Sequence, residues 1–207
     1  REYPFSSFYQ AEILPDVVPQ SEKLEIRQKL GIGEAKMLLA IGQFIPRKGF
    51  DVLLKAAAQL DKTVGIYFVG GEATPEYTAL RETLGLTNVH FVGFKPKAEL
   101  AEYYKAADAF VLPTREDIWG LVINEAMAYG LPVVTTDRCV AGMELVENGV
   151  NGYLVPVADE NALAYRLREL LSSDMSAMGR ISLKKIQNYT LENMAKAHMD
   201  YLQECGK

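Results

Sequence analysis

Short apolar runs that alternate with helix-forming segments constrain the fold of this chain more than any other feature. The apolar runs predict strands at Met37–Ile41, Gly65–Val69, Val89–Val92, Ala109–Leu112, Pro132–Thr135 and Tyr153–Val155. Helical spacing occurs between and after them, at Phe50–Leu60, Pro75–Leu84, Lys97–Lys105, Leu121–Tyr129, Glu160–Leu171, Ser176–Asn188 and Leu191–Glu204. Such alternation is typical of βαβ units. We therefore expect an α/β architecture with a parallel sheet.

The length of the chain leaves one large domain or two small ones open, and 49% hydrophobic content in 207 residues is enough for one sizeable core. The sequence contains no internal repeat. We therefore predict a single Rossmann-like domain over residues 21–207, with a parallel sheet of about six strands flanked by helices. Residues 1–20 contain three prolines and four aromatic residues, and we expect them to form an extended arm or an interlobe segment.

Composition and charge exclude several classes of protein. A net charge of -5 argues against a nucleic-acid surface. Neither a membrane-spanning apolar run nor a signal peptide is visible. The two cysteines, Cys139 and Cys205, are too few and too far apart for a disulfide framework, which favours a reduced cytoplasmic compartment. His90 and His198 have no ligand partners at metal-site spacing, so no metal site is expected.

The strongest functional signal is a segment at residues 114–134, which reads TREDIWGLVINEAMAYGLPVV. A short helix is expected to begin at its first glycine. Asp117 lies in the loop before this helix, and Glu125 lies eight positions later, just over one turn inside it. The first amides of a helix are unpaired donors and bind phosphate well; here they belong to Gly120, Leu121 and Val122. This pattern indicates a site for a sugar diphosphate.

Other polar or glycine-rich loops follow the earlier strands, at residues 43–49, 70–71 and 93–94. Ligands of parallel sheets bind beyond the carboxyl ends of the strands, and these loops and the segment above all fall there. Lys48 lies in the first loop, at the start of the following helix. A fixed cation there would stabilise the charge that develops on a diphosphate leaving group.

These motifs together resemble those of the group 1 (family 4) retaining glycosyltransferases, enzymes of the two-lobed GT-B fold. The likeness extends from about Lys36 to about Leu171 and includes GQFIPRKGFDVLLKA, FVGG, VHFVGF, the acidic-x7-acidic segment and NGYLVPVADENALA in the family's order. In that family the C-terminal lobe binds the donor nucleotide. The resemblance therefore implies that this chain is the donor lobe and that the N-terminal acceptor lobe is absent, so the chain alone is expected to be inactive.

The resemblance also implies roles for the basic loop. Lys48 matches the family's lysine that binds the diphosphate. The family's arginine is replaced here by Gln43, whose amide can still donate a hydrogen bond. Arg47 either compensates for the lost charge or points into solvent.

By the same comparison, Glu125 accepts hydrogen bonds from the ribose hydroxyls, and Asp117 holds a hydroxyl of the donor sugar. The family usually has Glu at the first acidic position, and the adjacent Glu116 leaves open which carboxylate acts. Gly93 and Phe94 match the loop whose backbone contacts the base, although a turn that ends a strand would explain them equally well.

The implied function is transfer of a hexose from a nucleoside diphosphate sugar to a hydroxyl acceptor with retention, in cell-surface glycan biosynthesis. No metal and no cofactor beyond the donor substrate is expected. The implied location is cytoplasmic, with peripheral membrane association of the full-length enzyme as one option. Two alternatives remain open: the donor lobe of a GT-B relative such as a UDP-sugar 2-epimerase, and a non-catalytic nucleotide-binding module.

Overall fold

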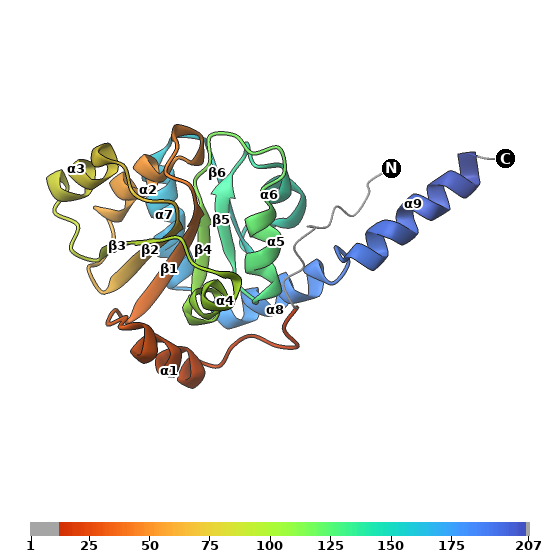
Figure 1. The fold of residues 1–207 in the computed structure, drawn as a ribbon, viewed down its shortest axis with the longest axis horizontal. Helices are drawn as coiled ribbons and strands as arrows, with labels where there is room; N and C mark the ends of the chain where they lie inside the picture. The colour runs from red at the N-terminus through yellow and green to blue at the C-terminus, as the bar shows by residue number, and fades with distance from the viewer. Residues whose placement is uncertain (1–12, 206–207) are drawn as a thin grey trace.

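Six parallel strands form the centre of the computed structural model, which describes residues 13–205. The strands are β1 (Lys36–Gly42), β2 (Val64–Gly70), β3 (Val89–Gly93), β4 (Ala109–Leu112), β5 (Val133–Thr136) and β6 (Gly152–Val155). Their order across the sheet is β3-β2-β1-β4-β5-β6 (Figure 1). The chain therefore builds outward from β1 to β3 and then returns to the other side of β1 with β4. Sheets of this topology bind ligands where the order reverses, between β1 and β4.

Helices cover both faces of the sheet. The described chain forms α1 (Gln20–Leu30), the 3-10 turn η1 (Pro46–Lys48), α2 (Phe50–Ala57), α3 (Pro75–Thr83), α4 (Lys97–Ala106), α5 (Leu121–Ala128), α6 (Val140–Leu145), α7 (Glu160–Leu171), α8 (Met175–Ile186) and α9 (Leu191–Cys205). Side chains of α2, α3 and α7 pack on one face, and those of α1, α4, α5 and α6 on the other. Helix α9 projects away from the sheet (Figure 1).

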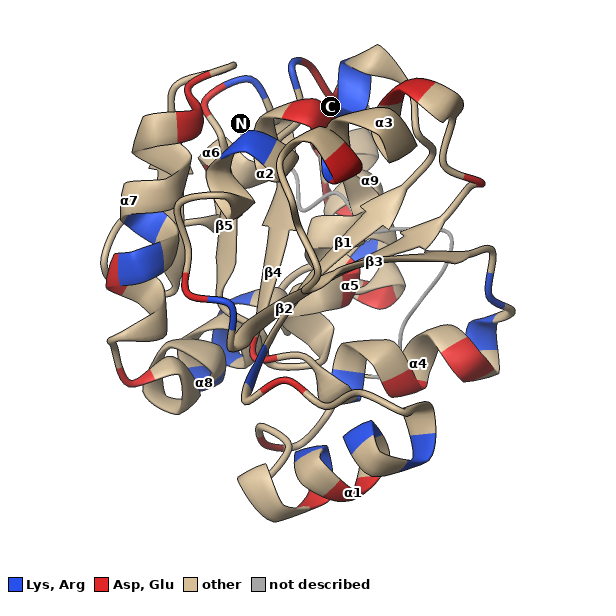
Figure 2. Ribbon diagram, turned by 90° about the vertical axis from the view of Figure 1, so that its left-hand side faces the viewer, with Lys and Arg blue, Asp and Glu red and all other residues tan. Residues whose placement is uncertain are grey.

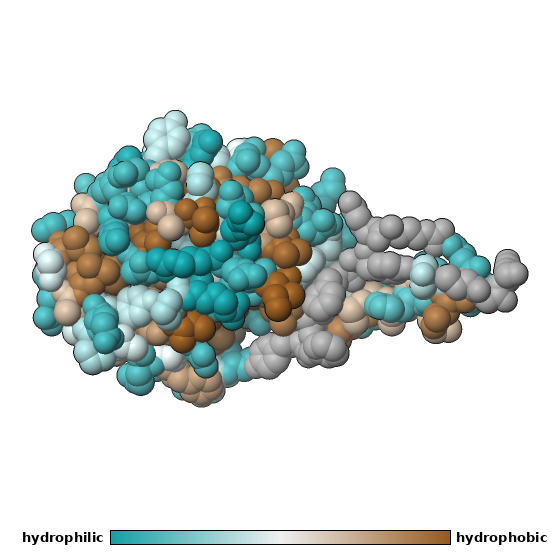
Figure 3. Space-filling model, turned by 90° about the horizontal axis from the view of Figure 1, so that it is seen from above, coloured by the Kyte–Doolittle hydropathy of each residue, from teal (hydrophilic) through white to brown (hydrophobic). Residues whose placement is uncertain are grey.

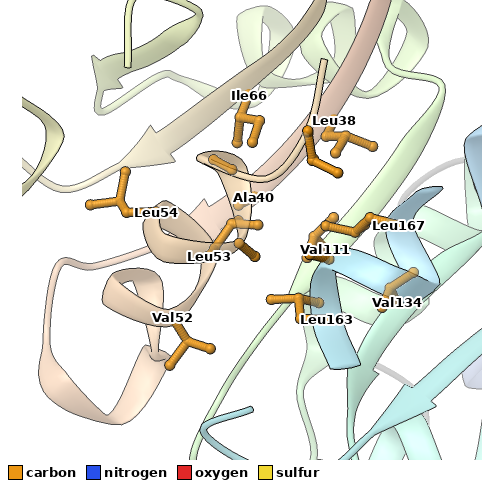
Figure 4. Close-up of a cluster of buried hydrophobic side chains, with 14 of the residues drawn as sticks. Leu38, Ala40, Val52, Leu53, Leu54, Ile66, Val111, Val134, Leu163 and Leu167 are labelled. Carbon is orange, nitrogen blue, oxygen red and sulfur yellow. The ribbon is translucent and has the colours of Figure 1, made fainter. Parts of the chain in front are cut away.

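The central strands are buried on both sides, because successive side chains of a strand point to opposite faces. In β1, Met37, Leu39 and Ile41 join the cluster under α4 and α5. Leu38 and Ala40 join the opposite cluster, together with side chains of α2 and α7 (Figure 4). A continuous apolar run of this kind forms a strand only where helices cover both faces, which explains the strength of the pattern in the sequence.

The predicted Rossmann-like sheet is confirmed, with all six strands present and β5 shifted by one residue. Helix α2 ends at Ala57, three residues earlier than predicted, and the chain continues through turns to Leu60. Helix α8 begins one residue earlier than predicted, because the Asp174 side chain accepts from the amide of Ala177 at 3.0 Å and caps it. Residues 1–12, most of the predicted arm, lie outside the described residues. Residues 13–19 precede α1, and the amide of Leu14 donates to the carbonyl of Ala128.

Helix α1 was not anticipated, because it is anchored by charge rather than by an apolar stripe. Its Arg27 side chain is 2% exposed and donates from Nε and Nη2 to the carbonyl of Ala106 at 2.8 and 2.6 Å. The same guanidinium pairs with Asp108 at 2.7 Å, and Asp108 in turn accepts from the amide of Met37. Arg27 thus satisfies the C-terminal end of α4 and ties α1 to the amino-terminal edge of the sheet.

Most charged residues lie on the outer surfaces of the helices and in loops, while the strands are largely uncharged (Figure 2). Within residues 13–205, no helix has the length and apolar character needed to cross a membrane.

We predict that Arg27→Met destabilises the domain by about 3–5 kcal/mol, because it removes the closest charged partner of the buried Asp108 and leaves only Lys23, whose Nζ lies 3.6 Å away. Urea denaturation would measure this loss. Arg180→Met is the matched control, because Arg180 pairs with Asp16 at a site where both side chains are more than half exposed. Such a surface pair contributes about 1 kcal/mol or less. Equal losses in the two variants would contradict the structural role assigned to Arg27.

Candidate functional site

Two loops meet at the carboxyl edge of the sheet, where the strand order reverses. The first runs from β1 through η1 to Gly49, and the second follows β4 at Pro113. Gly49 has a φ of 67°, and a Cβ at this position would lie 2.0 Å from the carbonyl oxygen of Pro113. Only glycine permits both the left-handed backbone and this close approach. The two loops can therefore touch.

Hydrogen bonds join the two loops beside this contact. The amide of Arg115 donates to the carbonyl of Arg47 at 2.7 Å, and the Thr114 hydroxyl donates to the same carbonyl at 2.9 Å. The Arg115 guanidinium binds both carboxylate oxygens of Asp51, at 2.8 and 2.7 Å, and also the carbonyl of Pro46. Arg115 therefore fastens the loop after β4 to the start of α2. A bidentate arrangement of this kind fixes orientation as well as distance.

The contact brings Lys48 to Asp117, two residues that are 69 positions apart. Lys48 Nζ lies 2.6 Å from Asp117 Oδ2, and both side chains are mostly buried. Arg47 Nη1 lies 3.5 Å from Asp117 Oδ1 and donates to the carbonyl of Glu116. The Glu116 residue itself is exposed. The geometry thus places the Asp117 carboxylate, not that of Glu116, beside the two cations.

The backbone of Asp117 is fixed by the segment that follows β5. Its amide donates to the carbonyl of Arg138 at 3.1 Å, and its carbonyl accepts from the amide of Val140 at 3.2 Å. Asp117 and Cys139 thereby form a short parallel bridge beyond the end of the sheet. The carboxylate is therefore held by regular backbone pairing, although it lies in a loop.

The N-terminus of α5 opens next to this carboxylate. Gly120 is its N-cap, with a φ of 98°, and no side chain caps the helix there. A Cβ on Gly120 would lie 2.7 Å from the sulfur of Cys139, so glycine is again required. The amides of Leu121 and Val122 belong to the first turn, whose donors have no partner within the helix. An anion at this position would find backbone donors and Lys48 together.

Glu125 lies one turn inside α5, on the side that faces α4. Its Oε2 accepts a hydrogen bond of 2.7 Å from the hydroxyl of Tyr104. Burial raises the pKa of the Glu125 carboxyl above its usual value, and the Tyr104 hydrogen bond partly opposes this shift. Glu125 is only partly buried, so the carboxylate can still reach a ligand.

The remaining candidates lie along the same edge. Gln43 is exposed directly after β1. Gly93 ends β3 with a φ of 76°, and Phe94 beside it is 78% exposed. Because β2 separates β3 from β1, Gly93 and Phe94 flank the site rather than join the Lys48–Asp117 contact.

A hollow of about 520 Å³ adjoins Asp117 on the side of β5 and α6. Its lining combines charged residues with three exposed apolar ones, and consists of Arg115, Glu116, Asp117, Ile118, Asp137, Arg138, Val140 and Met143. Figure 3 looks down on the top of the molecule as drawn in Figure 1, where hydrophobic patches interrupt a mainly hydrophilic surface. The part of the chain that the structure describes contains no cluster of His, Cys, Asp or Glu suited to a metal ion.

Sequence reasoning missed residues that hold other parts of the site in place. Tyr104 and Arg115 are the main ones, and each contacts a partner far away in the sequence. The sequence does contain the adjacent tyrosines of α4 and the basic residue after Thr114. Nothing local in the sequence showed which carboxylate each would bind.

The fold defines a Rossmann-like α/β domain with a polar site at the carboxyl edge of its sheet, and sequence comparison assigns its family. The profile of the family described as "Glycosyl transferases group 1" matches residues 22–192. The chain therefore belongs to the group 1 glycosyl transferases.

Several curated proteins are similar to this chain. It is 36% identical over 186 residues to a D-inositol 3-phosphate glycosyltransferase of Corynebacterium urealyticum, covering 82% of this chain and 43% of that protein. It is 34% identical over 150 residues to the lipopolysaccharide glucosyltransferase WaaG of Escherichia coli K12, covering 70% of this chain and 36% of WaaG. The chain thus spans less than half the length of these relatives.

Solved structures show the same fold. The Anabaena HepE structure in complex with UDP superposes with a TM-score of 0.80 at 26% identity, over 90% of this chain and 53% of HepE. A sucrose-phosphate synthase from Thermosynechococcus elongatus gives a TM-score of 0.78 at 28% identity, over 88% of this chain and 48% of that one. The expected GT-B-type Rossmann-like fold is confirmed.

We predict that Gly49→Ala destabilises the domain well beyond the cost of its backbone strain. Gly31→Ala is the matched control, because Gly31 has a similar φ of 71° and no atom within 4 Å of its added Cβ. The control should lose about 1–2 kcal/mol through left-handed strain, and Gly49→Ala about 1–3 kcal/mol more, because the loops must separate. Urea denaturation of both variants measures the difference. Equal losses would show that the loop contact is not needed.

Proposed function

We propose that this chain is the donor-binding lobe of a retaining glycosyltransferase, which transfers a hexose from a nucleoside diphosphate sugar to a hydroxyl acceptor in cell-surface glycan biosynthesis. The observation that carries the proposal is the meeting of Lys48 and Asp117 at the uncapped start of α5, with Glu125 one turn further along. Asp117, Lys48 with the helix terminus, and Glu125 would then contact the sugar, the diphosphate and the ribose of one nucleoside diphosphate sugar, in that order. Family membership supports transfer over the epimerase alternative and over a non-catalytic module.

In this proposal the diphosphate lies between Lys48 and the amides of Gly120, Leu121 and Val122, where cation and helix terminus both favour negative charge. Gln43 and Arg47 border it, and Arg47 supplies part of the charge that the missing family arginine would provide. The side chain of Arg47 is exposed and is held by one hydrogen bond to the carbonyl of Glu116 and a 3.5 Å ion pair with Asp117. It can therefore turn toward a ligand. As the bond to the sugar breaks, these donors stabilise the charge on the leaving diphosphate.

Glu125 accepts the ribose hydroxyls, because a carboxylate oxygen takes charge-assisted hydrogen bonds well. Asp117 holds a hydroxyl of the donor sugar, and the hollow beside it leaves room for that sugar. Gly93 and Phe94 border the base from the far side of β2. No metal and no cofactor other than the donor takes part, because Lys48, Arg47 and the helix terminus supply the positive field. We place the whole enzyme in the cytoplasm, with the option of attachment to the inner face of the membrane.

We predict that this chain binds a nucleoside diphosphate but does not transfer sugar by itself. All the proposed donor groups lie in this lobe, whereas the matched part of this chain covers only 43% of the Corynebacterium relative. UDP is the first probe, because the similar HepE structure contains it, and GDP and ADP complete the panel. Binding to the native state should raise the melting temperature, with and without EDTA. A curve that no nucleotide moves at millimolar concentration would refute the donor-lobe assignment, and a shift lost in EDTA would reveal an ion site.

We also predict that Lys48→Ala lowers the affinity for UDP by about tenfold or more and leaves the affinity for uridine nearly unchanged. Only the diphosphate loses a charged partner. The difference should shrink as salt rises. Lys62→Ala is the control, since Lys62 is exposed in the loop before β2, at the opposite edge. Isothermal titration measures both ligands. If Lys48→Ala weakened uridine and UDP equally, the assignment of Lys48 to the diphosphate would be wrong.

Glu125→Gln should weaken UDP and uridine alike, because both contain the ribose. Gln is preferred to Ala here because it preserves an acceptor for the hydroxyl of Tyr104, which is buried. If Glu125→Gln bound uridine with wild-type affinity, the assignment of Glu125 to the ribose would be wrong.

A further inference from the structure

Helix α4 reaches the proposed ribose carboxylate through Tyr104. The side chain is 2% exposed, and its hydroxyl donates to Glu125 Oε2 at 2.7 Å. Its ring stacks on Tyr129, with ring centres 4.9 Å apart and planes 2° from parallel. Phe110 of β4 lies near the same ring, at 6.2 Å. The ring is therefore held by both α5 and the sheet, which sets the direction of the hydroxyl.

Two of these contacts come from one face of α5. Glu125 lies in α5, and Tyr129, four residues later, is the C-cap residue with which the helix ends, so the two side chains lie about one turn apart on the same side. Tyr129 fixes the ring while Glu125 takes the hydroxyl. A change at the Tyr104 hydroxyl would therefore act on the carboxylate without displacing the ring.

We propose that Tyr104 is a positioning residue for Glu125: by holding Oε2 it leaves Oε1 directed at the ribose hydroxyls of the donor nucleotide. The inference rests on the proposed function of Glu125. It adds a residue from a different helix, and it explains how a partly buried carboxylate keeps one orientation although no arginine or lysine within residues 13–205 is hydrogen-bonded to it. Among the described residues, the only hydrogen-bond donor to the Glu125 carboxylate is Tyr104.

The charge state of Glu125 depends on the same contact. Burial favours the neutral carboxyl, whereas the Tyr104 hydroxyl and the positive charge of Lys97, both from α4, favour the ionised form. No other charged or titratable group of the described chain acts on this carboxyl. Removal of the hydroxyl leaves burial less opposed, so the pKa of Glu125 should rise. The ionised form is the better acceptor for ribose, and its loss should begin at a higher pH.

Tyr104→Phe tests this inference, because it deletes the hydroxyl and keeps the ring. Carbon-13 NMR of the glutamate carboxyls in the ligand-free chain should show one titration, that of Glu125, moved to higher pH. Uridine and UDP should then bind about tenfold more weakly at acidic pH. The loss should be recovered as the pH rises. A purely structural role would lower the melting temperature but would not produce a weakening that depends on pH.

Tyr103→Phe is the matched control, because it makes the same chemical change at the neighbouring buried position of α4, which lies near Tyr67. This variant should keep the wild-type titration and binding. An unchanged Glu125 titration in Tyr104→Phe would overturn the inference whether or not any nucleotide binds. A shifted titration with wild-type uridine affinity at every pH would overturn the positioning role. Failure of the wild-type chain to bind any nucleotide would instead refute the proposed function.

Discussion

The candidate site depends on the contact between the loop after β1 and the loop after β4. A carbonyl of one loop occupies the space that a side chain at Gly49 would need. Because the loops touch there, Lys48 and Asp117 come within hydrogen-bond distance, and Arg115 can reach Asp51. The parallel sheet supplies the rest, since β1 and β4 are neighbours and end at the same edge. The contact between Lys48 and Asp117 thus requires a residue without a Cβ at position 49.

The ion pair at this contact orders its members before any ligand arrives. Lys48 is flexible by nature, and a free lysine would lose side-chain entropy on binding an anion. Its bond to Asp117 removes much of that freedom in advance. Glu125 is ordered in a similar way through Tyr104. Both proposed polar contacts are therefore preorganised, and preorganised groups lose less on binding.

The strands and the positions of the loops could be predicted from the sequence because buried parallel strands are continuous apolar runs. The start of α5 was equally visible, since Gly120 precedes a clear helical pattern. Helix α1 was missed because its main anchor is Arg27, whose partners Ala106 and Asp108 are brought near only by the sheet. Pattern analysis detects amphipathic helices and has little to detect in this one.

The residues of the candidate site likewise include some that the sequence could reveal and some that it could not. Motif spacing located Lys48, Asp117 and Glu125 as candidates, and in the structure Lys48 and Asp117 lie within hydrogen-bond distance. Spacing could not decide between Asp117 and Glu116, because that choice depends on a backbone bridge to Cys139 beyond the end of the sheet. Spacing also could not reveal Tyr104, because a buried tyrosine looks like any other core residue until its partner is known. The roles of these residues in binding remain predictions.

The buried Arg27–Asp108 pair lies at the amino edge of the sheet, opposite the candidate site. The groups that anchor α1 to the core are thus separate from those proposed to recognise the ligand. Loops at the carboxyl edge, such as the one that contains Gln43, can then change their polar residues without disturbing that anchor. Such separation gives a lineage room to acquire new donors on an unchanged framework.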